Sequence, residues 1–255
     1  DQPQSTEESD PVQSLMKFEF EPIGIIQSCF KEKFGIPRQS GLIPEAEAIL
    51  TILPPYNRAE AFRDIEGYSH LWLSFVFHAA IRDQWKPTVR PPRLGGNQRV
   101  GVFATRSPFR PNPIGLSVVK LIDLDISAQQ IKLKLGGVDL LDGTPVLDIK
   151  PYVPYSDAIP DAAAGFAPTP PGRAIQLSFS QQAESELEKY SAEQVTQLKR
   201  LIYQILANNP RPSYLEQEKR NRFGMRLYDF NIIWEVEEDR YRITELSPLS
   251  DQPFA

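Results

Sequence analysis

The 255-residue chain has a single cysteine, Cys29, and only two histidines, His70 and His78. One cysteine cannot form an internal disulfide, and so few cysteine and histidine side chains cannot assemble a zinc site. We therefore expect neither a disulfide framework nor a metal site. A reducing, cytoplasmic location suits such a chain.

Long apolar runs are also missing. No stretch approaches the roughly 20 consecutive apolar residues that a membrane-spanning helix needs, and no apolar segment near the start resembles a signal peptide. Hydrophobic residues make up 41% of the chain and charged residues 24%, as is typical of soluble globular proteins. The length suffices for one large domain or two small ones. We expect a globular protein without a membrane partner.

The common nucleotide-binding fingerprints are absent. No Gly-x-Gly-x-x-Gly segment lies between a strand and a helix, and no glycine-rich loop ends in Lys-Ser or Lys-Thr. Two glycine pairs, Gly95-Gly96 and Gly136-Gly137, lack that context, and we expect them in turns or bulges. The residue pattern alone therefore identifies no cofactor.

A proline-rich loop follows an apolar segment near the middle of the chain. It carries Arg106, Arg110 and Asn112, and three prolines within six residues fix φ near about −65° and remove backbone donors. Guanidinium groups on such a stiff loop lose little entropy when they bind a planar or anionic ligand. A surface turn with solvated arginines is the alternative, but the density of Arg, Asn and Pro favours a ligand site.

Basic residues are concentrated in one segment, although the whole chain has a formal net charge of −5. Residues 82–110, the basic strip, hold seven basic side chains and one acidic side chain, Asp83, for a net charge of +6. The basic residues are Arg82, Lys86, Arg90, Arg93, Arg99, Arg106 and Arg110. Such a segment suits nucleic-acid phosphates, and Trp85 and Phe109 offer flat surfaces on which bases could stack.

A second interpretation of the basic strip remains open. The arginines could pair with acidic side chains elsewhere in the fold, including Glu45, Glu47 and Glu60. If they do not, we expect Arg90, Arg93, Arg110 and Asn112 to bind RNA.

The first 150 residues are rich in predicted strands. We expect strands at residues 18–30 (broken at Gly24), 48–53, 71–77, 100–104, 116–124 and 131–135. One short helix, at residues 59–63, interrupts them. Strands at this spacing without long helices favour a closed or nearly closed barrel over a doubly wound sheet. The predicted fold class is therefore mainly β.

The last third of the chain has a different pattern. Residues 151–173 are dense in Pro, Ala, Gly and Asp, which predicts a loop. Residues 181–208 have the spacing of an amphipathic helix, which Asn208-Asn209-Pro210 is expected to stop. Strands at 228–236 and 240–246 form a predicted hairpin. We expect a disordered lead-in (1–14), a barrel domain (15–160), a linker (161–174) and a small α+β domain (175–255).

Several ordered motifs also resemble one family. Residues 101–115, Gly-Val-Phe-Ala-Thr-Arg-Ser-Pro-Phe-Arg-Pro-Asn-Pro-Ile-Gly, resemble the signature of the TsaA-like proteins, whose characterised members are the TrmO tRNA methyltransferases. Matching blocks follow the same order at 23–28, 34–39, 69–73, 90–96 and 139–145, and more loosely at 227–234. The resemblance implies a single-sheet barrel, a homodimer and S-adenosylmethionine bound on the barrel. The implied reaction is methylation of N6 of threonylcarbamoyladenosine, just 3′ of the anticodon.

The resemblance also implies a set of cofactor contacts. They are Pro37, Arg38, Gln39, His78, Ala79, Arg106, Leu116, Asp142, Gly143, Thr144 and Pro145. Asp142 could accept a hydrogen bond from an amino or ribose hydroxyl group, and Leu116 could pack on the adenine. Arg38 or Arg106 could pair with the methionine carboxylate.

The two histidines lie eight residues apart, which would place them on one face of a strand. His70 is better explained as a structural hydrogen-bonding residue, and His78 is the better site candidate. We expect a methyltransferase that binds the tRNA anticodon stem-loop. A module that binds tRNA and senses the cofactor without turnover is the alternative. The basic strip disfavours a small-molecule methyltransferase.

Overall fold

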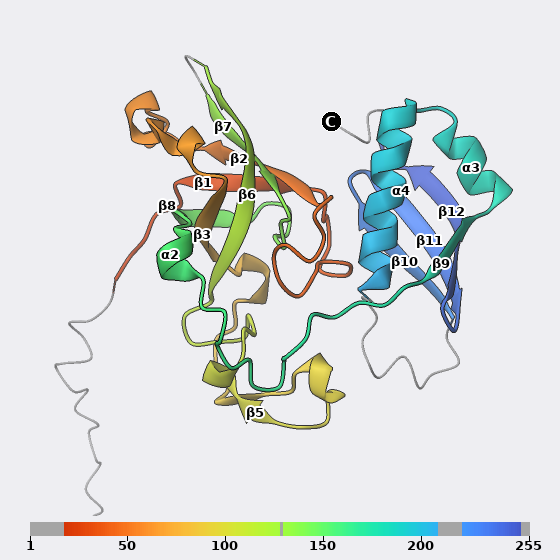
Figure 1. Ribbon diagram of the computed structural model, residues 1–255, viewed down its shortest axis with the longest axis horizontal. Coiled ribbons are helices and arrows are strands. Elements are labelled where there is room, and N and C mark those ends of the chain that lie inside the picture. Colours follow the sequence, from red (N-terminus) through yellow and green to blue (C-terminus); the bar gives the residue numbers. More distant parts are fainter. Residues whose placement is uncertain (1–17, 128–129, 209–220, 251–255) are drawn as a thin grey trace, which may run out of the picture.

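Six strands close into a barrel. The computed structural model describes residues 18–127, 130–208 and 221–250, and Figure 1 shows the barrel beside a smaller α+β unit. Neighbouring barrel strands are all antiparallel, in the order β1 (Gly24–Ser28), β2 (Glu47–Ile52), β7 (Ile131–Gly136), β6 (Ile114–Ile126), β3 (His70–Val76) and β8 (Pro145–Pro151). The predicted fold class, a mainly β chain with a single-sheet barrel and a small α+β unit, is confirmed.

The barrel interior follows from alternating side chains. In β7, Ile131, Leu133 and Leu135 are buried while Lys132 and Lys134 lie partly in solvent. Successive residues of a strand point to opposite faces of the sheet, so this alternation assigns the lysines to the outside. Burying the apolar set stabilises the barrel by about 25 cal/mol per Å² of apolar surface.

The strand directions gather three long connections at one end of the barrel. The strands β1, β3 and β7 end where β2, β6 and β8 begin, which places the connections 29–46, 77–113 and 137–144 together. Figure 1 shows the connection 77–113 below the barrel and the β6–β7 hairpin above it. The opposite end carries η1 (Ala59–Phe62) and η2 (Ile65–Gly67).

The connection 77–113 has its own short elements. They are η3 (His78–Ala80), β4 (Thr88–Val89), η4 (Pro92–Leu94), β5 (Val100–Gly101) and η5 (Val102–Ala104). The strands β4 and β5 pair with each other. Between them Gly95 and Gly96 have φ values of 71° and 72°, as expected for turn glycines.

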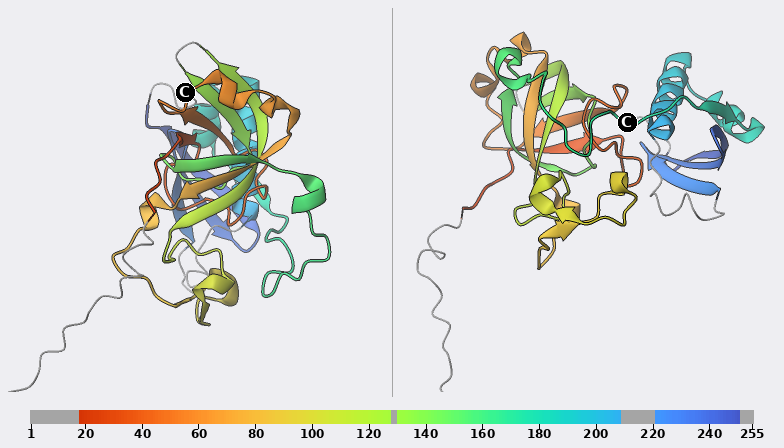
Figure 2. Two further views of the ribbon diagram at one scale, coloured as in Figure 1. Left: turned by 90° about the vertical axis from the view of Figure 1, so that its left-hand side faces the viewer. Right: turned by 60° about the horizontal axis from the view of Figure 1, so that its bottom comes forward.

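The α+β unit is a four-stranded sheet backed by two helices. Its order is β10 (Arg222–Leu227), β11 (Phe230–Glu237), β12 (Arg240–Pro248) and β9 (Gln176–Phe179), with β9 parallel to β12. In Figures 1 and 2, α3 (Gln181–Leu187) and α4 (Ala192–Ala207) lie on one side of this sheet. Trp234 stacks on Phe223 with ring centroids 4.8 Å apart in its core.

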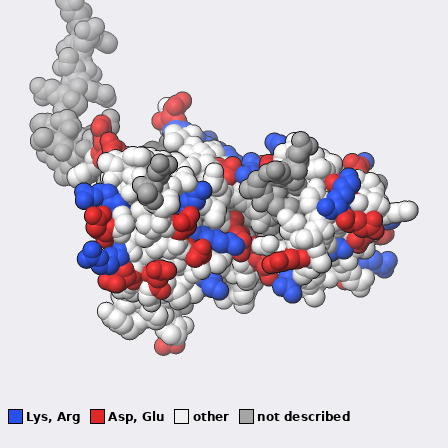
Figure 3. Space-filling model, turned by 90° about the horizontal axis from the view of Figure 1, so that it is seen from above, with Lys and Arg blue, Asp and Glu red and all other residues white. Residues whose placement is uncertain are grey.

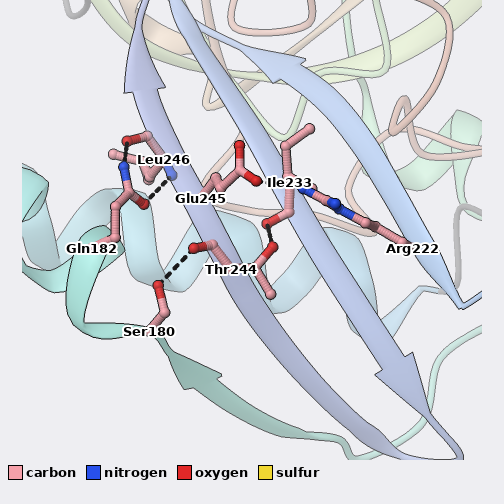
Figure 4. A network of polar contacts seen from close by, with 7 residues as sticks. All are labelled: Ser180, Gln182, Arg222, Ile233, Thr244, Glu245 and Leu246. Atoms are coloured by element: carbon pink, nitrogen blue, oxygen red, sulfur yellow. Dashed lines mark hydrogen bonds and ion pairs between the residues drawn. The ribbon is translucent and has the colours of Figure 1, made fainter.

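Polar contacts fix α3 to β12, as Figure 4 shows. The hydroxyl of Ser180 donates to the carbonyl of Thr244 at 2.7 Å, and the Gln182 amide both donates to and accepts from the Leu246 backbone at 3.1 Å. Arg222 of β10 and Glu245 of β12 form an ion pair across β11. These contacts join α3 and β10 to β12.

The structure corrects several predicted elements. The first strand is β1 alone and not 18–30, and the predicted strand 100–104 becomes the 3₁₀ turn η5 after Gly101. The predicted helix 181–208 is two helices, because the Ser191 hydroxyl accepts a hydrogen bond from the Gln194 N–H and begins α4 there. The strands β8, β9 and β10 and the short helix α2 (Pro154–Asp157) were not predicted.

Two expectations concern residues that the structure leaves undescribed. The disordered lead-in, residues 1–14, is one, and part of the predicted helix stop at Asn208-Asn209-Pro210 is the other. The last described residue of that stop, Asn208, is the C-cap of α4. Among the described residues, no helix is long and apolar enough to cross a bilayer.

The connection 29–46 lies against both the barrel and the α+β unit. The Tyr228 N–H donates to the carbonyl of Cys29 at 2.7 Å, and Phe30 forms a β-bridge with Leu227. Further along, the Glu45 N–H donates to the side-chain carbonyl of Gln204 in α4 at 3.2 Å. These contacts hold the connection in place at the end of the barrel.

Candidate active site

A cavity of about 1530 Å³ lies at the end of the barrel where the connections meet. Its walls come from residues 38–42, from residues 80–113 and from residues 164–171, which join the barrel to the α+β unit. Drug-sized pockets usually enclose about 300–1,000 Å³. The cavity therefore has room for more than one small ligand.

The cavity is strongly cationic. Eight basic side chains and one acidic side chain, Asp83, line it. The basic residues are Arg38 and all seven members of the basic strip: Arg82, Lys86, Arg90, Arg93, Arg99, Arg106 and Arg110. On the face seen in Figure 3, by contrast, basic side chains are interspersed with acidic ones.

The alternative interpretation of the basic strip is not supported. Each acid named for it pairs with another base: Glu45 with Arg200 at 3.9 Å, Glu47 with Lys134 at 3.0 Å and Glu60 with Arg58 at 3.8 Å. Within residues 18–127, 130–208 and 221–250, the ion pairs involve no side chain of the basic strip. Within these parts of the fold, the charge of the basic strip is therefore not balanced by ion pairs.

Two arginines of the basic strip, Arg93 and Arg110, bind neutral groups. The Arg110 guanidinium donates to the carbonyl oxygens of Thr105 at 3.1 Å and Ser107 at 3.4 Å, which closes the proline loop on itself. Arg93 donates to the backbone carbonyl and the hydroxyl of Thr169 in the segment 164–171. Arg110 therefore shapes the loop, and Arg93 ties the far wall of the cavity to the barrel end.

Two predicted cofactor contacts meet directly. The Arg106 guanidinium donates to the Gln39 side-chain carbonyl, which links the proline loop to the connection 29–46. Both side chains line the cavity, and so does Arg38. Pro37, next to them, is buried. The predicted contacts at 37–39 and 106 are thus gathered at one wall.

A buried glycine anchors the end of the proline loop. A Cβ atom added at Gly115 would lie 2.2 Å from the Phe75 ring, so a larger residue there would have to displace that buried ring. The Phe77 N–H also donates to the carbonyl of Pro113 at 2.8 Å. Leu116 follows at the rim of the barrel with 56% of its surface exposed, whereas Asn112 is exposed in the loop and does not line the cavity.

The turn 142–145 lies at the same end of the barrel but does not line the cavity. The Asp142 carboxylate accepts from the Ser28 N–H at 2.8 Å and pairs with Lys31 at 3.2 Å. Gly143 has a φ of 77°, and the Thr144 hydroxyl donates to the carbonyl of Leu141 at 2.6 Å. These residues form a tight turn that leads into β8 at Pro145. Its cofactor role stays a prediction.

The two histidines do not share a strand face. The strand β3 ends at Val76, and His78 begins the 3₁₀ turn η3. His70 is the first residue of β3, at the opposite end of the barrel, with its Nδ1 atom 2.9 Å from the Ser69 hydroxyl. His78 and Ala79 adjoin the cavity wall at Ala80, so only the second histidine lies near it.

The sequence prediction missed Asp139. Its carboxylate accepts a hydrogen bond from the Ser117 hydroxyl at 2.7 Å, next to Leu116. Burial raises the pKa of this carboxyl, while the Ser117 hydroxyl, the Ser40 backbone and Arg106 oppose the rise. Asp139 opens the motif at residues 139–145, in which only the second aspartate was named.

We expect the stability of an Asp139→Asn variant to depend on pH differently from that of the wild type. Because the folded-state pKa is raised, the folded protein holds the proton more tightly, so wild-type stability falls relative to the variant as pH rises above about 4. Urea unfolding of both proteins at several pH values below and above about 4 measures the difference between their free energies of unfolding. A difference that does not change with pH would contradict the raised pKa of Asp139.

An antiparallel barrel with a cationic cavity at one end has the charge that suits a phosphate-rich ligand. The chain belongs to the TrmO family. The family models for the tRNA-methyltransferase O N-terminal domain and the TrmO C-terminal domain match residues 25–158 and 172–249. The family predicted from the sequence motifs is confirmed.

Named relatives cover most of the chain. It is 46% identical over 235 residues to the tRNA (adenine(37)-N6)-methyltransferase of Escherichia coli K12, covering 92% of this chain and all of that protein. The chain is also 49% identical over 213 residues to RcsF of Pseudomonas aeruginosa, which is named provisionally as an S-adenosylmethionine-dependent methyltransferase. This match covers 84% of this chain and 90% of that protein. A crystal structure of TrmO from Pseudomonas aeruginosa superposes with a TM-score of 0.74 at 42% identity, covering 91% of this chain and 99% of that one.

Proposed function

We propose that the protein transfers a methyl group from S-adenosylmethionine to N6 of the threonylcarbamoyl-modified adenosine next to the anticodon of tRNA. The observation that carries this proposal is the arrangement of the basic strip. All seven of its basic side chains line one cavity, and one of them, Arg106, is bound to Gln39 there. Family membership and the names of the relatives support the same reaction.

The residues at this end of the barrel fit the cofactor chemically. Arg106 is held by Gln39 through one nitrogen and keeps further N–H groups for a carboxylate. Leu116 offers an exposed apolar surface at the rim, which suits an adenine. When bound, S-adenosylmethionine supplies a methyl group already activated on a sulfonium. The chain's residues hold and orient the two reactants, and such alignment can supply most of the acceleration.

The nitrogen that accepts the methyl group must lose a proton. Of the two histidines only His78 lies at this end of the barrel. It is therefore the imidazole available to accept that proton.

The tRNA would be held by its phosphates. Arg90 is exposed and Arg93 half-buried, and both line the cavity. Arg110 has further N–H groups besides those that close the loop. Asn112, outside the cavity lining, would contact the RNA at its edge. Three of the four expected RNA contacts, Arg90, Arg93 and Arg110, thus line the cavity that also holds Arg106 and Gln39.

We also propose that the protein is a cytoplasmic homodimer. The outward face of β6 carries an apolar row of Ile114 and Ile122, which are 45% and 41% exposed. A second copy covering this apolar row would remove it from water. The mass of the protein in solution, measured by light scattering, tests this part of the proposal.

A labelled-methyl assay distinguishes an enzyme from a cofactor-sensing module. We expect repeated transfer of labelled methyl to tRNA, with no loss in excess chelator, because a sulfonium methyl is already activated. The Cys29 thiol is buried, which raises its pKa to about 12, so thiol reagents should leave the native enzyme active. Binding of both cofactor and tRNA without any transfer would replace the enzyme with the sensor.

A further inference from the structure

Two exposed aromatic side chains line the cavity side by side. The ring centroids of Trp85 and Phe103 are 6.3 Å apart, and the ring planes are inclined by 37°. Half of the Trp85 surface and 73% of the Phe103 surface remain exposed. Large aromatic residues exposed as neighbours are unusual in a structure unless a ligand covers them.

The two rings stand on an ordered support. Val102, next to Phe103, is buried, and its N–H donates to the carbonyl of Pro87 at 2.9 Å. The pairing of β4 with β5 joins the Trp85 side of the connection to the Phe103 side. The Thr105 hydroxyl donates to the carbonyl of Val102 at 2.8 Å and closes the turn. The rings are therefore positioned before any ligand arrives.

The other aromatic candidate, Phe109, is already covered on one face. The Arg82 guanidinium carbon lies 3.7 Å from the centre of its ring, in a cation–π contact. From the sequence, we expect bases to stack on Trp85 and Phe109. Phe103 replaces Phe109 in this pair, because the Phe103 ring is the more exposed.

We propose that Trp85 and Phe103 form the stacking site for the target adenine, received in an unstacked conformation. This inference rests on the proposed function. RNA loops are commonly recognised by bases that leave the stack and lie on aromatic side chains. The same cavity holds Arg106 and Gln39, so a base bound there lies in the compartment assigned to the methyl donor. The cationic side chains around the rings, Lys86 and Arg99 among them, would neutralise the flanking phosphates.

An anticodon stem-loop RNA containing 2-aminopurine tests the site without turnover. The fluorescent base is placed at the target position in one RNA and at the neighbouring loop position in another. We expect binding to quench the target-position probe through stacking. Trp85→Ala and Phe103→Ala should each weaken binding by about five- to 100-fold and abolish that quenching. S-adenosylmethionine affinity, measured by calorimetry, should be unchanged.

Two controls accompany the variants. Tyr155→Ala removes an aromatic side chain that is 93% exposed in α2, outside the cavity, and should leave binding and quenching as in the wild type. Trp85→Phe keeps a flat ring and should restore most of the affinity.

Unchanged affinity and quenching in both alanine variants would overturn the stacking site alone. Quenching confined to the neighbouring-position probe would also overturn it, because the rings would then hold a flanking base. A wild-type protein that binds neither RNA would remove the proposed tRNA function and the stacking site together.

Discussion

Replacing Arg106 with alanine should weaken S-adenosylmethionine binding at least tenfold while leaving the melting temperature nearly unchanged. A hydrogen bond to a charged group contributes about 1.5–3 kcal/mol, and a tenfold loss corresponds to about 1.4 kcal/mol. The Arg106 side chain is exposed in the cavity and bound to Gln39, so its removal leaves no gap in the core. Isothermal titration with the cofactor measures the loss.

A matched control for this variant is Arg58→Ala. Arg58 is also exposed, but it lies at the opposite end of the barrel and pairs with Glu60. Its loss should not change cofactor affinity. If Arg106→Ala binds the cofactor as tightly as Arg58→Ala does, the proline loop is not part of the cofactor site.

Reversing the charge of Arg90 and Arg93 together should raise the dissociation constant for tRNA at least tenfold at low salt. If each arginine contacts one phosphate, the slope of log affinity against log salt should flatten by about 0.7–0.9 per lost contact. Cofactor affinity should barely change, because neither residue belongs to the Arg106–Gln39 wall. Binding titrations at several salt concentrations measure both quantities.

The control reverses two basic residues elsewhere on the barrel. Lys120 in β6 lies opposite His70 of β3, and Lys150 in β8 lies opposite Trp72 of the same strand. Both lysines are therefore at the end of the barrel away from the cavity. Their reversal changes the net charge by the same amount but should leave the salt slope nearly intact. Identical slopes for the Arg90/Arg93 variant and the wild type would show that these arginines do not contact RNA.

The barrel could be predicted because its strands carry a clear alternation. In β7, for example, apolar residues alternate with Lys132 and Lys134, and the structure buries the apolar set. The strand β8 was missed because it begins and ends with proline, at Pro145 and Pro151, and only Val146 within it is fully buried. In β10 the signal was present, since Phe223, Met225 and Leu227 alternate with exposed residues.

The site could be predicted only in part, because much of it depends on contacts between distant residues. The Arg106–Gln39 contact joins segments 67 residues apart, and Arg93 meets Thr169 76 residues away. Nothing in a Pro- and Gly-rich linker indicates that residues 164–171 form a cavity wall. The importance of Asp139 is hidden in the same way, since its partner Ser117 lies 22 residues away, in β6.

Nucleoside mass spectrometry tests the proposed methyl transfer to N6 of the modified adenosine most directly. tRNA with and without the threonylcarbamoyl group is incubated with enzyme and S-adenosylmethionine, then digested and analysed. We expect one added methyl on N6 of the threonylcarbamoylated nucleoside and almost none on unmodified adenosine, because a ureido-type N–H is easier to deprotonate than an adenine amine. Equal methylation of both RNAs, or a methyl group on any other nucleoside, would contradict the account.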